Sequence, residues 1–238
     1  MVISLWSGPR NCSTALMYSF AQRSDMKVVD EPLFGHFLRK TGVERPSRKE
    51  VIRSMPWKRE EVLKQWEGAN QHVFLKHMGN HLEGWSTSDF EMHKHLILVR
   101  DPRNVLNSYR AHIKRPTTMD LAYNHQWKWF NHCEQSGWPV AVIESDALVA
   151  NPEASLRTIC DWLGLLFDSA MLQWPRGPRE EDGIWAKYWY ERVHASTGWE
   201  SPAEERSIDS NPTLPKSLKP LLQEVEPIYD QLKRKSII

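Results

Sequence analysis

The sequence Val2-Ile-Ser-Leu-Trp-Ser-Gly-Pro-Arg-Asn-Cys-Ser-Thr14 joins a strand pattern to a helix pattern through one tight turn. Val2 to Trp6 form an apolar run typical of a buried strand, and Ser7-Gly8-Pro9 ends it. Residues 13 to 23 then have the apolar spacing of a helix. A buried strand that passes directly into a helix is the basic unit of a parallel α/β sheet.

The same unit recurs along the chain. Four further apolar runs predict strands at Met26–Val29, His72–Leu75, His95–Val99 and Val140–Ile143. Helical patterns follow at about 13–23, 103–112 and 118–136. Continuous apolar runs, rather than alternating ones, indicate strands covered on both faces. We therefore predict a three-layer α/β fold with a mostly parallel central sheet flanked by helices, in which ligands bind beyond the carboxyl ends of the strands.

Domain organisation follows from composition along the chain. The length of 238 residues fits one domain, and we expect residues 1–238 to form it. An amphipathic helical insertion is expected at about 40–70, and a lid or loop rich in Pro, Gly and Trp at about 175–215. An amphipathic helix is expected at 217–235.

Composition excludes several broad classes of protein. Lys and Arg total 31 against 30 Asp and Glu, so the net charge of +1 gives no support to a nucleic-acid partner. Cys12, Cys133 and Cys160 are too few and too widely spaced for a disulfide framework. We see no signal peptide and no apolar stretch of membrane-spanning length, so a cytoplasmic protein without a membrane partner is expected.

The turn from Gly8 to Thr14 has the composition of a phosphate cradle. A loop at this place presents backbone N–H groups at a helix N-terminus, where the helix dipole favours an anion, and Arg10, Ser13 and Thr14 can add donors. It is not a Walker A loop, because Thr14 stands where that motif requires lysine. An ordinary Gly-Pro turn capped by Ser13 explains the same residues equally well.

A second candidate anion site lies in Val99-Arg-Asp-Pro-Arg-Asn-Val-Leu-Asn-Ser-Tyr109. Arg100 ends a predicted strand, and Ser108 follows about two helical turns later, so both can face one anion. The planar fork of arginine suits a phosphate. Alternatively, Asp101-Pro102 simply starts a helix and Arg100 pairs with a surface carboxylate.

These segments together resemble the sulfotransferase family, whose members transfer the sulfuryl group of 3′-phosphoadenosine 5′-phosphosulfate (PAPS). The chain is similar to the P-loop-like bacterial and carbohydrate-type branch of the family. The resemblance rests on three motifs in the family's order. The motifs are Ser7–Thr14, Leu98–Tyr109, and the strand, acidic-Leu turn and helix of Ile143–Leu165.

The resemblance implies how PAPS would be bound. Gly8, Pro9, Arg10, Asn11, Cys12, Ser13 and Thr14 would hold the 5′-phosphosulfate, and Arg100 and Ser108 would hold the 3′-phosphate. Ser196-Thr197-Gly198 resembles a loop that family members place over the nucleotide. The chain departs from the family pattern at Arg10, where many members carry lysine, and at Asn11-Cys12, where a glycine is usual.

The catalytic roles have several candidates. Arg10 and Lys76 would supply positive charge to the leaving phosphate oxygen, which is what sulfuryl transfer requires. Glu31, in a Glu-Pro-Leu segment like that of carbohydrate-type members, is the preferred base for the acceptor hydroxyl. His77 is the alternative, although family members that use histidine read Lys-x-His and this chain reads Lys-His. A helix-start charge at Glu31 and a solvated edge charge at Lys76 would explain both residues without catalysis.

We expect a sulfotransferase that acts in line and without a metal on the hydroxyl of a small molecule or carbohydrate. Histidine pairs such as His77/His81 lack the further ligands of a zinc site. A P-loop kinase-like enzyme predicts a Walker lysine that this loop lacks, and a non-catalytic PAPS-binding module would keep the cradle without the chemistry. The sequence selects neither the acceptor nor an oligomeric state.

Overall fold

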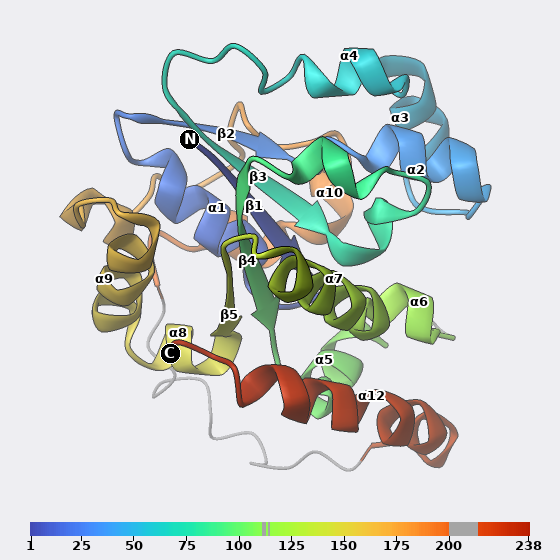
Figure 1. Cartoon of the computed structure of the whole chain (residues 1–238). Coiled ribbons are helices and arrows are strands. Elements are labelled where there is room, and N and C mark those ends of the chain that lie inside the picture. Colours follow the sequence, from blue (N-terminus) through green and yellow to red (C-terminus); the bar gives the residue numbers. More distant parts are fainter. Residues whose placement is uncertain (111–112, 114, 200–213) are drawn as a thin grey trace.

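The computed structural model describes residues 1–110, 113, 115–199 and 214–238. Within them one parallel sheet has the strand order β2-β3-β1-β4-β5 (Figure 1). Its strands are β1 (Val2–Ser7), β2 (Met26–Asp30), β3 (His72–Met78), β4 (His93–Val99) and β5 (Val140–Glu144). All five predicted strands are present, each extended by one to three residues at an end, and the α/β prediction is confirmed.

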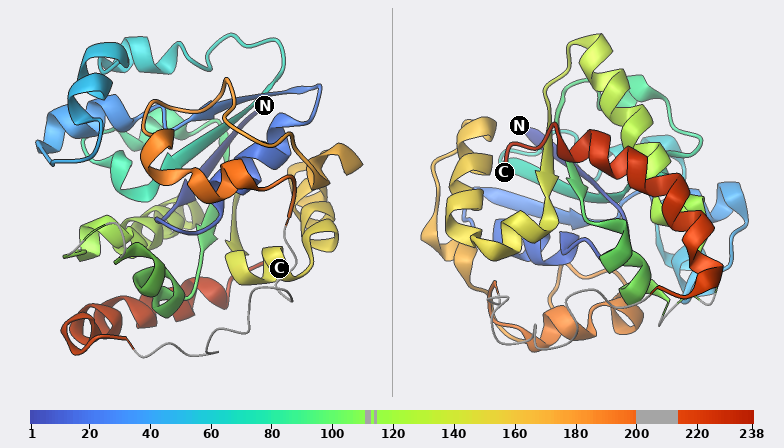
Figure 2. Two further views of the ribbon diagram at one scale, coloured as in Figure 1. Left: turned by 180° about the vertical axis from the view of Figure 1, so that it is seen from behind. Right: turned by 90° about the horizontal axis from the view of Figure 1, so that it is seen from below.

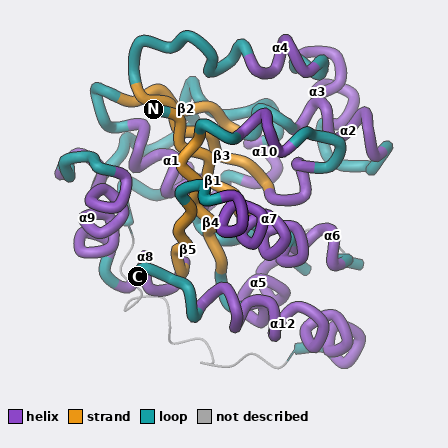
Figure 3. Tube along the Cα trace, in the orientation of Figure 1, coloured by secondary structure: helices purple, strands orange, loops and turns teal. Residues whose placement is uncertain are grey.

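Helices surround the sheet, as the tube in Figure 3 shows. The α-helices are α1 (Ser13–Ala21), α2 (Phe34–Thr41), α3 (Arg48–Ser54), α4 (Arg59–Leu63), α5 (Pro102–Tyr109), α6 (Thr118–Leu121), α7 (Tyr123–Ser136), α8 (Ser145–Ala150), α9 (Pro152–Leu163), α10 (Ala186–Trp189), α11 (Glu191–Ala195) and α12 (Lys219–Lys233). Short 3₁₀ helices are η1 (Gly79–Leu82), η2 (Thr87–Phe90), η3 (Ser169–Leu172) and η4 (Lys216–Leu218). No helix among the described residues is long and apolar enough to cross a membrane.

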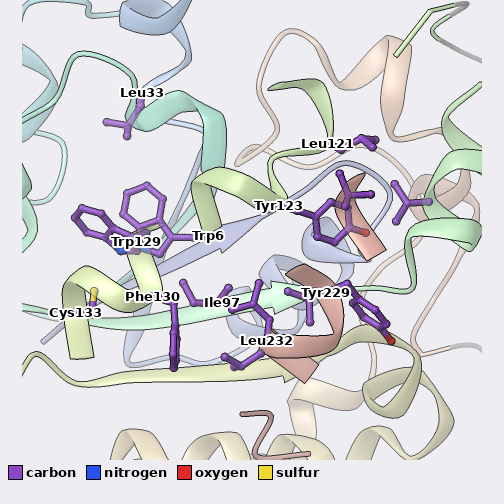
Figure 4. Close-up of a cluster of buried hydrophobic side chains, with 14 of the residues drawn as sticks. Trp6, Leu33, Ile97, Leu121, Tyr123, Trp129, Phe130, Cys133, Tyr229 and Leu232 are labelled. Carbon is purple, nitrogen blue, oxygen red and sulfur yellow. The ribbon is translucent and has the colours of Figure 1, made fainter. Parts of the chain in front are cut away.

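The two faces of the sheet carry different cores. On one face, Ile3 and Leu5 pack with residues of α1 and α9. On the other, Trp6 packs with residues of α7 and α12, and Figure 4 shows Trp6 beside Trp129 of α7. Successive side chains of a strand point to opposite faces, so each strand supplies both cores.

The predicted helix over 118–136 is two helices, because Ala122 adopts a left-handed backbone conformation that interrupts the helix. Ala122 has a φ of 66° and ends α6 while it precedes α7. The junction packs against the turn after β1, where a Cβ on Gly8 would lie 2.7 Å from the Leu121 carbonyl oxygen. The absence of a side chain at Gly8 therefore lets the end of α6 approach the loop without a clash. Residues 111–112 of the helix expected at 103–112, and residues 200–213 of the expected lid, lie outside the described residues.

Three buried histidines occupy the α7 side of the sheet. The Ser4 hydroxyl lies 2.8 Å from His93 Nδ1 and 3.5 Å from His77 Nε2, and Trp6 Nε1 donates to His95 Nδ1 at 3.2 Å. Burial lowers the pKa of His93 to about 4 and that of His95 to about 3, and it holds the pKa of His77 well below its usual value. These rings are therefore neutral in the folded protein.

The fold should lose stability in mild acid. The pKa of such a histidine is lower in the folded protein than in the unfolded chain, where it is near 6.5. As the pH falls from 6.5 toward the folded-state pKa, the unfolded chain takes up a proton that the folded protein does not, so the free energy of unfolding decreases. Between pH 7 and pH 5 each of the three should cost about 2 kcal/mol of unfolding free energy. Glu31 and Glu144, whose pKa values are raised by burial, act in the opposite sense but are outnumbered by these histidines. Urea unfolding at both pH values measures the loss.

His93→Gln supplies the control for this acid effect. Its unfolding free energy should change less between pH 7 and pH 5 than that of the natural protein, by about 2 kcal/mol. An equal change in the two proteins would show that His93 does not contribute to acid lability.

Candidate functional site

The loop between β1 and α1 opens its backbone toward a pocket. Arg10 and Cys12 both have positive φ, 61° and 59°, which is costly for residues with a Cβ. Such left-handed residues turn consecutive N–H groups toward one concave side, which is how backbone nests bind anions. No side chain caps the N-terminus of α1, so its first N–H groups are not used by a capping residue.

Asn11 holds this loop to the rest of the fold. The side-chain amide of Asn11 donates to the Leu98 carbonyl of β4 at 2.9 Å, and the backbone carbonyl of Asn11 accepts from the Ser145 hydroxyl of α8 at 2.9 Å. Asn11 is buried, with 1% of its surface exposed. The asparagine that departs from the family pattern is therefore an anchor that fixes the loop to two neighbouring strand ends.

The second candidate anion site adjoins the loop. Arg10 Nε donates to the Ser108 hydroxyl at 2.9 Å, and Arg100 Nη1 donates to the Arg10 carbonyl at 2.9 Å. Arg100 Nε also donates to Asp146 at 3.1 Å. The structure thus brings the β1 turn and the β4 turn, about ninety residues apart in sequence, into one continuous surface.

This surface concentrates positive charge. Burial lowers the pKa of the Arg10 guanidinium, and the nearby charges of Arg100 and Arg192 lower it further. Arginine remains protonated in spite of such shifts. Cations held this close repel one another, so an anion placed among them is favoured.

Glu31 and Lys76 lie at the neighbouring strand ends. Lys76 Nζ donates to Glu31 Oε1 at 2.6 Å and to Asp30 Oδ1 at 2.9 Å. Burial opposes the charge of Lys76, but the two carboxylates raise its pKa well above the usual value. Burial raises the pKa of Glu31 to about 6, so the carboxylate is a stronger base than an exposed one. Tyr190 joins the same cluster, with its hydroxyl 2.7 Å from Lys76 Nζ.

His77 lies on the other face of the sheet. In β3 it shares the direction of Val73 and Leu75, which belong to the core under α7 and α12, and its ring stacks on Trp6 with centroids 4.1 Å apart. Lys76 points the opposite way and lines the pocket. The register of one strand thus separates two consecutive residues, and the structure does not bring His77 to the pocket.

Residues after η3 form one wall of the pocket. Figure 2 shows this orange segment packed against the blue N-terminal part of the chain. Trp185 and Tyr190 share a buried cluster with Phe34 and Phe37 of α2. Ser196 accepts from Trp174 Nε1 at 3.1 Å, and Ser196 and Gly198 line the main pocket.

The pocket has a volume of about 540 Å³, within the range of small-molecule sites. The predicted site residues that line it are Gly8, Pro9, Arg10, Asn11, Cys12, Ser13, Thr14, Glu31, Lys76, Arg100, Ser108, Ser196 and Gly198. Thr197 lines an adjoining, more open hollow beside Trp199. No group of His, Cys, Asp and Glu side chains in the described part of the chain is arranged to hold a metal ion.

Sequence reasoning missed several pocket residues. Tyr190, Arg192 and His81 line the pocket, and Asp30 bonds to Lys76 within it. Asp30 could have been found, because it directly precedes Glu31 at the end of a predicted strand. No local motif marks Tyr190 or Arg192. They line the pocket because the tertiary fold returns their segment to the sheet, and the sequence around them does not show this.

The fold and the pocket define an α/β protein that has a parallel sheet, a cationic turn after its first strand and a buried carboxylate after its second. The model of a family described as a sulfotransferase domain matches residues 1–236. The chain therefore belongs to the sulfotransferase family.

Two curated relatives from Arabidopsis thaliana are similar to almost the whole chain. Branched-chain-amino-acid aminotransferase-like proteins 1 and 2 are 40% and 39% identical over 236 residues, which is 98% of this chain and 41% of each relative. The chain thus spans about two fifths of the length of the relatives it matches. Each relative is therefore more than twice as long as the part of it that this chain matches.

Solved sulfotransferase structures share the fold. The sulfotransferase domain from the curacin biosynthetic pathway has a TM-score of 0.59 and 17% identity, and covers 97% of this chain and 96% of its own. The domain from the Synechococcus PCC 7002 olefin synthase has a TM-score of 0.57 and 18% identity, with 98% and 94% covered. The Alicyclobacillus acidocaldarius sulfotransferase has a TM-score of 0.57 and 12% identity, with 98% and 95% covered.

Proposed function

We propose that this protein is a sulfotransferase that moves a sulfuryl group from PAPS to a hydroxyl of a small molecule or carbohydrate. The observation that carries the proposal is the 2.9 Å contact between Arg10 Nε and Ser108 Oγ, which joins the two candidate anion sites beside Glu31. PAPS has two separate phosphate positions on one adenosine, and a continuous cationic surface can hold both.

The pocket residues divide the roles of donor binding and proton removal. The N–H groups of Gly8 and of residues 10–14 would hold the 5′-phosphosulfate, and Arg100 and Ser108 the 3′-phosphate. In the transfer, the acceptor oxygen forms a bond to sulfur while the bond from sulfur to the bridging phosphate oxygen breaks. Glu31 takes the acceptor proton, and Arg10 stabilises the charge that develops on the departing phosphate.

Thermal-shift titration separates this function from its rivals. The sulfotransferase and a non-catalytic PAPS-binding module both predict a rise in melting temperature with adenosine 3′,5′-bisphosphate (PAP) and a smaller one with ATP. A kinase-like enzyme predicts the largest rise with ATP and magnesium. Loss of sulfate from PAPS with a panel of hydroxyl acceptors then separates enzyme from module, and no transfer to any acceptor would leave the module.

Cys12 reports directly where the nucleotide binds. It lines the pocket and is partly exposed, whereas Cys133 and Cys160 are buried. Saturating PAP should slow alkylation of Cys12 by iodoacetamide at least about tenfold, because the ligand covers the loop. Mass spectrometry of the modified peptide measures the rate. A rate unchanged by PAP, under conditions where PAP raises the melting temperature, would place the nucleotide elsewhere.

A further inference from the structure

The ammonium group of Lys76 uses all of its hydrogen-bonding capacity inside the protein. A lysine ammonium has three N–H donors. Those of Lys76 reach Asp30 Oδ1 at 2.9 Å, Glu31 Oε1 at 2.6 Å and the Tyr190 hydroxyl at 2.7 Å, and its side chain is 2% exposed. No donor is left for a phosphate oxygen, so the geometry does not suit the leaving-group role expected from the sequence.

Asp30 and Tyr190 complete a closed network around this lysine. The Tyr190 hydroxyl lies 2.8 Å from Asp30 Oδ2 and accepts from Trp185 Nε1 at 3.2 Å. The backbone N–H of Gly183 donates to the same Asp30 oxygen at 3.1 Å. The network therefore joins β2 and β3 to the segment that forms the pocket wall. Satisfied buried networks of this kind fix a single arrangement of their side chains.

The two carboxylates are not equivalent within the network. Asp30 receives hydrogen bonds from Lys76, Tyr190 and Gly183. Among the described residues Glu31 receives one, from Lys76 to Oε1. Hydrogen bonds stabilise a carboxylate as an anion, and Glu31 has fewer of them than Asp30. Glu31 Oε2 accepts no hydrogen bond from the described residues, so it is the carboxylate oxygen of the pair that is open to a new donor.

The same contacts hold the backbone of Glu31 in a strained conformation. Its φ is 45°, in the left-handed region that residues with a Cβ seldom adopt. The Glu31 N–H donates to the Lys76 carbonyl at 2.8 Å. Lys76 therefore holds Glu31 by its backbone as well as by its carboxylate. Strain kept in place by surrounding contacts is characteristic of functional positions.

We infer that Lys76, Asp30 and Tyr190 are positioning residues, which hold the Glu31 carboxylate toward the pocket and leave it as the one proton acceptor of the cluster. This inference rests on the proposed function, in which Glu31 is the base. It moves Lys76 from the leaving phosphate to the base, and it gives the segment around Tyr190 a part in setting the reactivity of Glu31.

The charges around Glu31 make the inference measurable. Burial raises the pKa of Glu31, the positive charge of Lys76 lowers it, and the negative charge of Asp30 raises it. The other titratable groups that face Glu31 are His81 of η1, whose Nδ1 lies 4.0 Å from Oε2, and the phenols of Tyr190 and Tyr109. Burial holds the pKa of His81 well below its usual value, so this ring is neutral.

Two substitutions should therefore shift Glu31 in opposite directions. Lys76→Met should raise the pKa of Glu31 by about one to three units, and Asp30→Asn should lower it by about one unit. Tyr188→Phe makes the same kind of change at an exposed position of α10 outside the pocket and is the control, with a shift below about half a unit. Carbon-13 NMR of the side-chain carboxyl measures the titration, and Glu31→Gln assigns the resonance. Lys76→Met leaves two buried carboxylates without their cation, which lowers stability, so the double variant Asp30→Asn/Lys76→Met, which keeps the net charge of the cluster, supplies the check on folding.

The acidic limb of turnover should follow the same shifts, with PAP affinity unchanged within about twofold. If Lys76 instead served the leaving phosphate, Lys76→Met would lower turnover at every pH without moving that limb, and the inference would be wrong. A Glu31 pKa that moves in one direction in both variants, or in neither, would also overturn it. Failure of the natural protein to bind PAP would refute the proposed function and leave the NMR result to stand on its own.

Discussion

Glu31→Gln is expected to lower sulfuryl transfer by about 100-fold or more while PAP affinity stays within about twofold of the natural protein, because general-base catalysis contributes a factor of this size. The glutamine amide keeps the shape of the side chain but does not take up the proton of the substrate hydroxyl. The nucleotide contacts assigned to the loop and to Arg100 do not involve Glu31. Turnover with the fastest acceptor of the panel, together with calorimetric titration of PAP, gives both quantities.

Glu191→Gln is the matched control for this prediction. It makes the same chemical change at an exposed position of α11, and it should leave turnover unchanged. If Glu31→Gln retained turnover, Glu31 would not be the base. His77 faces the other side of the sheet, so the role would then pass to His81, which lines the pocket.

Arg100→Ala is expected to weaken PAP binding by about 100-fold, the effect of removing one partner of a partly buried charge-assisted contact. The substitution has two consequences. It removes the guanidinium assigned to the 3′-phosphate, and it removes the donor that holds the Arg10 carbonyl at 2.9 Å. Arg100→Lys keeps the charge but loses the planar fork, so its affinity should lie between the two.

Arg103→Ala tests whether general loss of positive charge explains the effect. Arg103 lies on the same helix, but it is exposed and pairs with Glu226 of α12 at 2.9 Å, away from the pocket. Its loss should leave PAP affinity unchanged within about twofold. Equal weakening by Arg100→Ala and Arg103→Ala would contradict a specific phosphate contact at Arg100.

The sequence was sufficient to predict the sheet and the turns that follow its strands. Buried parallel strands are short and continuously apolar, so their ends are marked by the first polar residues, as at Ser7, Asp30 and Arg100. Because those ends meet at one edge of a parallel sheet, residues 8–14, Glu31, Lys76 and Arg100 could be predicted to share a site. The pocket lining has this arrangement.

Side-chain direction and long-range contacts were beyond the sequence. Lys76 and His77 are adjacent and equally polar, and the strand register alone places one in the pocket and the other beside Trp6. Tyr190 reaches Lys76 from a segment more than one hundred residues later, through helices that carry no motif. The break at Ala122 was missed because alanine is a good helix former, and packing against Gly8 overrides that preference.

We expect one ligand to carry two phosphate groups into one pocket, the first at the loop after β1 and the second at Arg100. Calorimetric titration of the natural protein with PAP and with adenosine 5′-monophosphate, which differ by the 3′-phosphate, tests it most directly. PAP should bind about 100-fold more tightly than adenosine 5′-monophosphate, and Arg100→Ala should remove the difference. Equal affinity for the two nucleotides in the natural protein would contradict it.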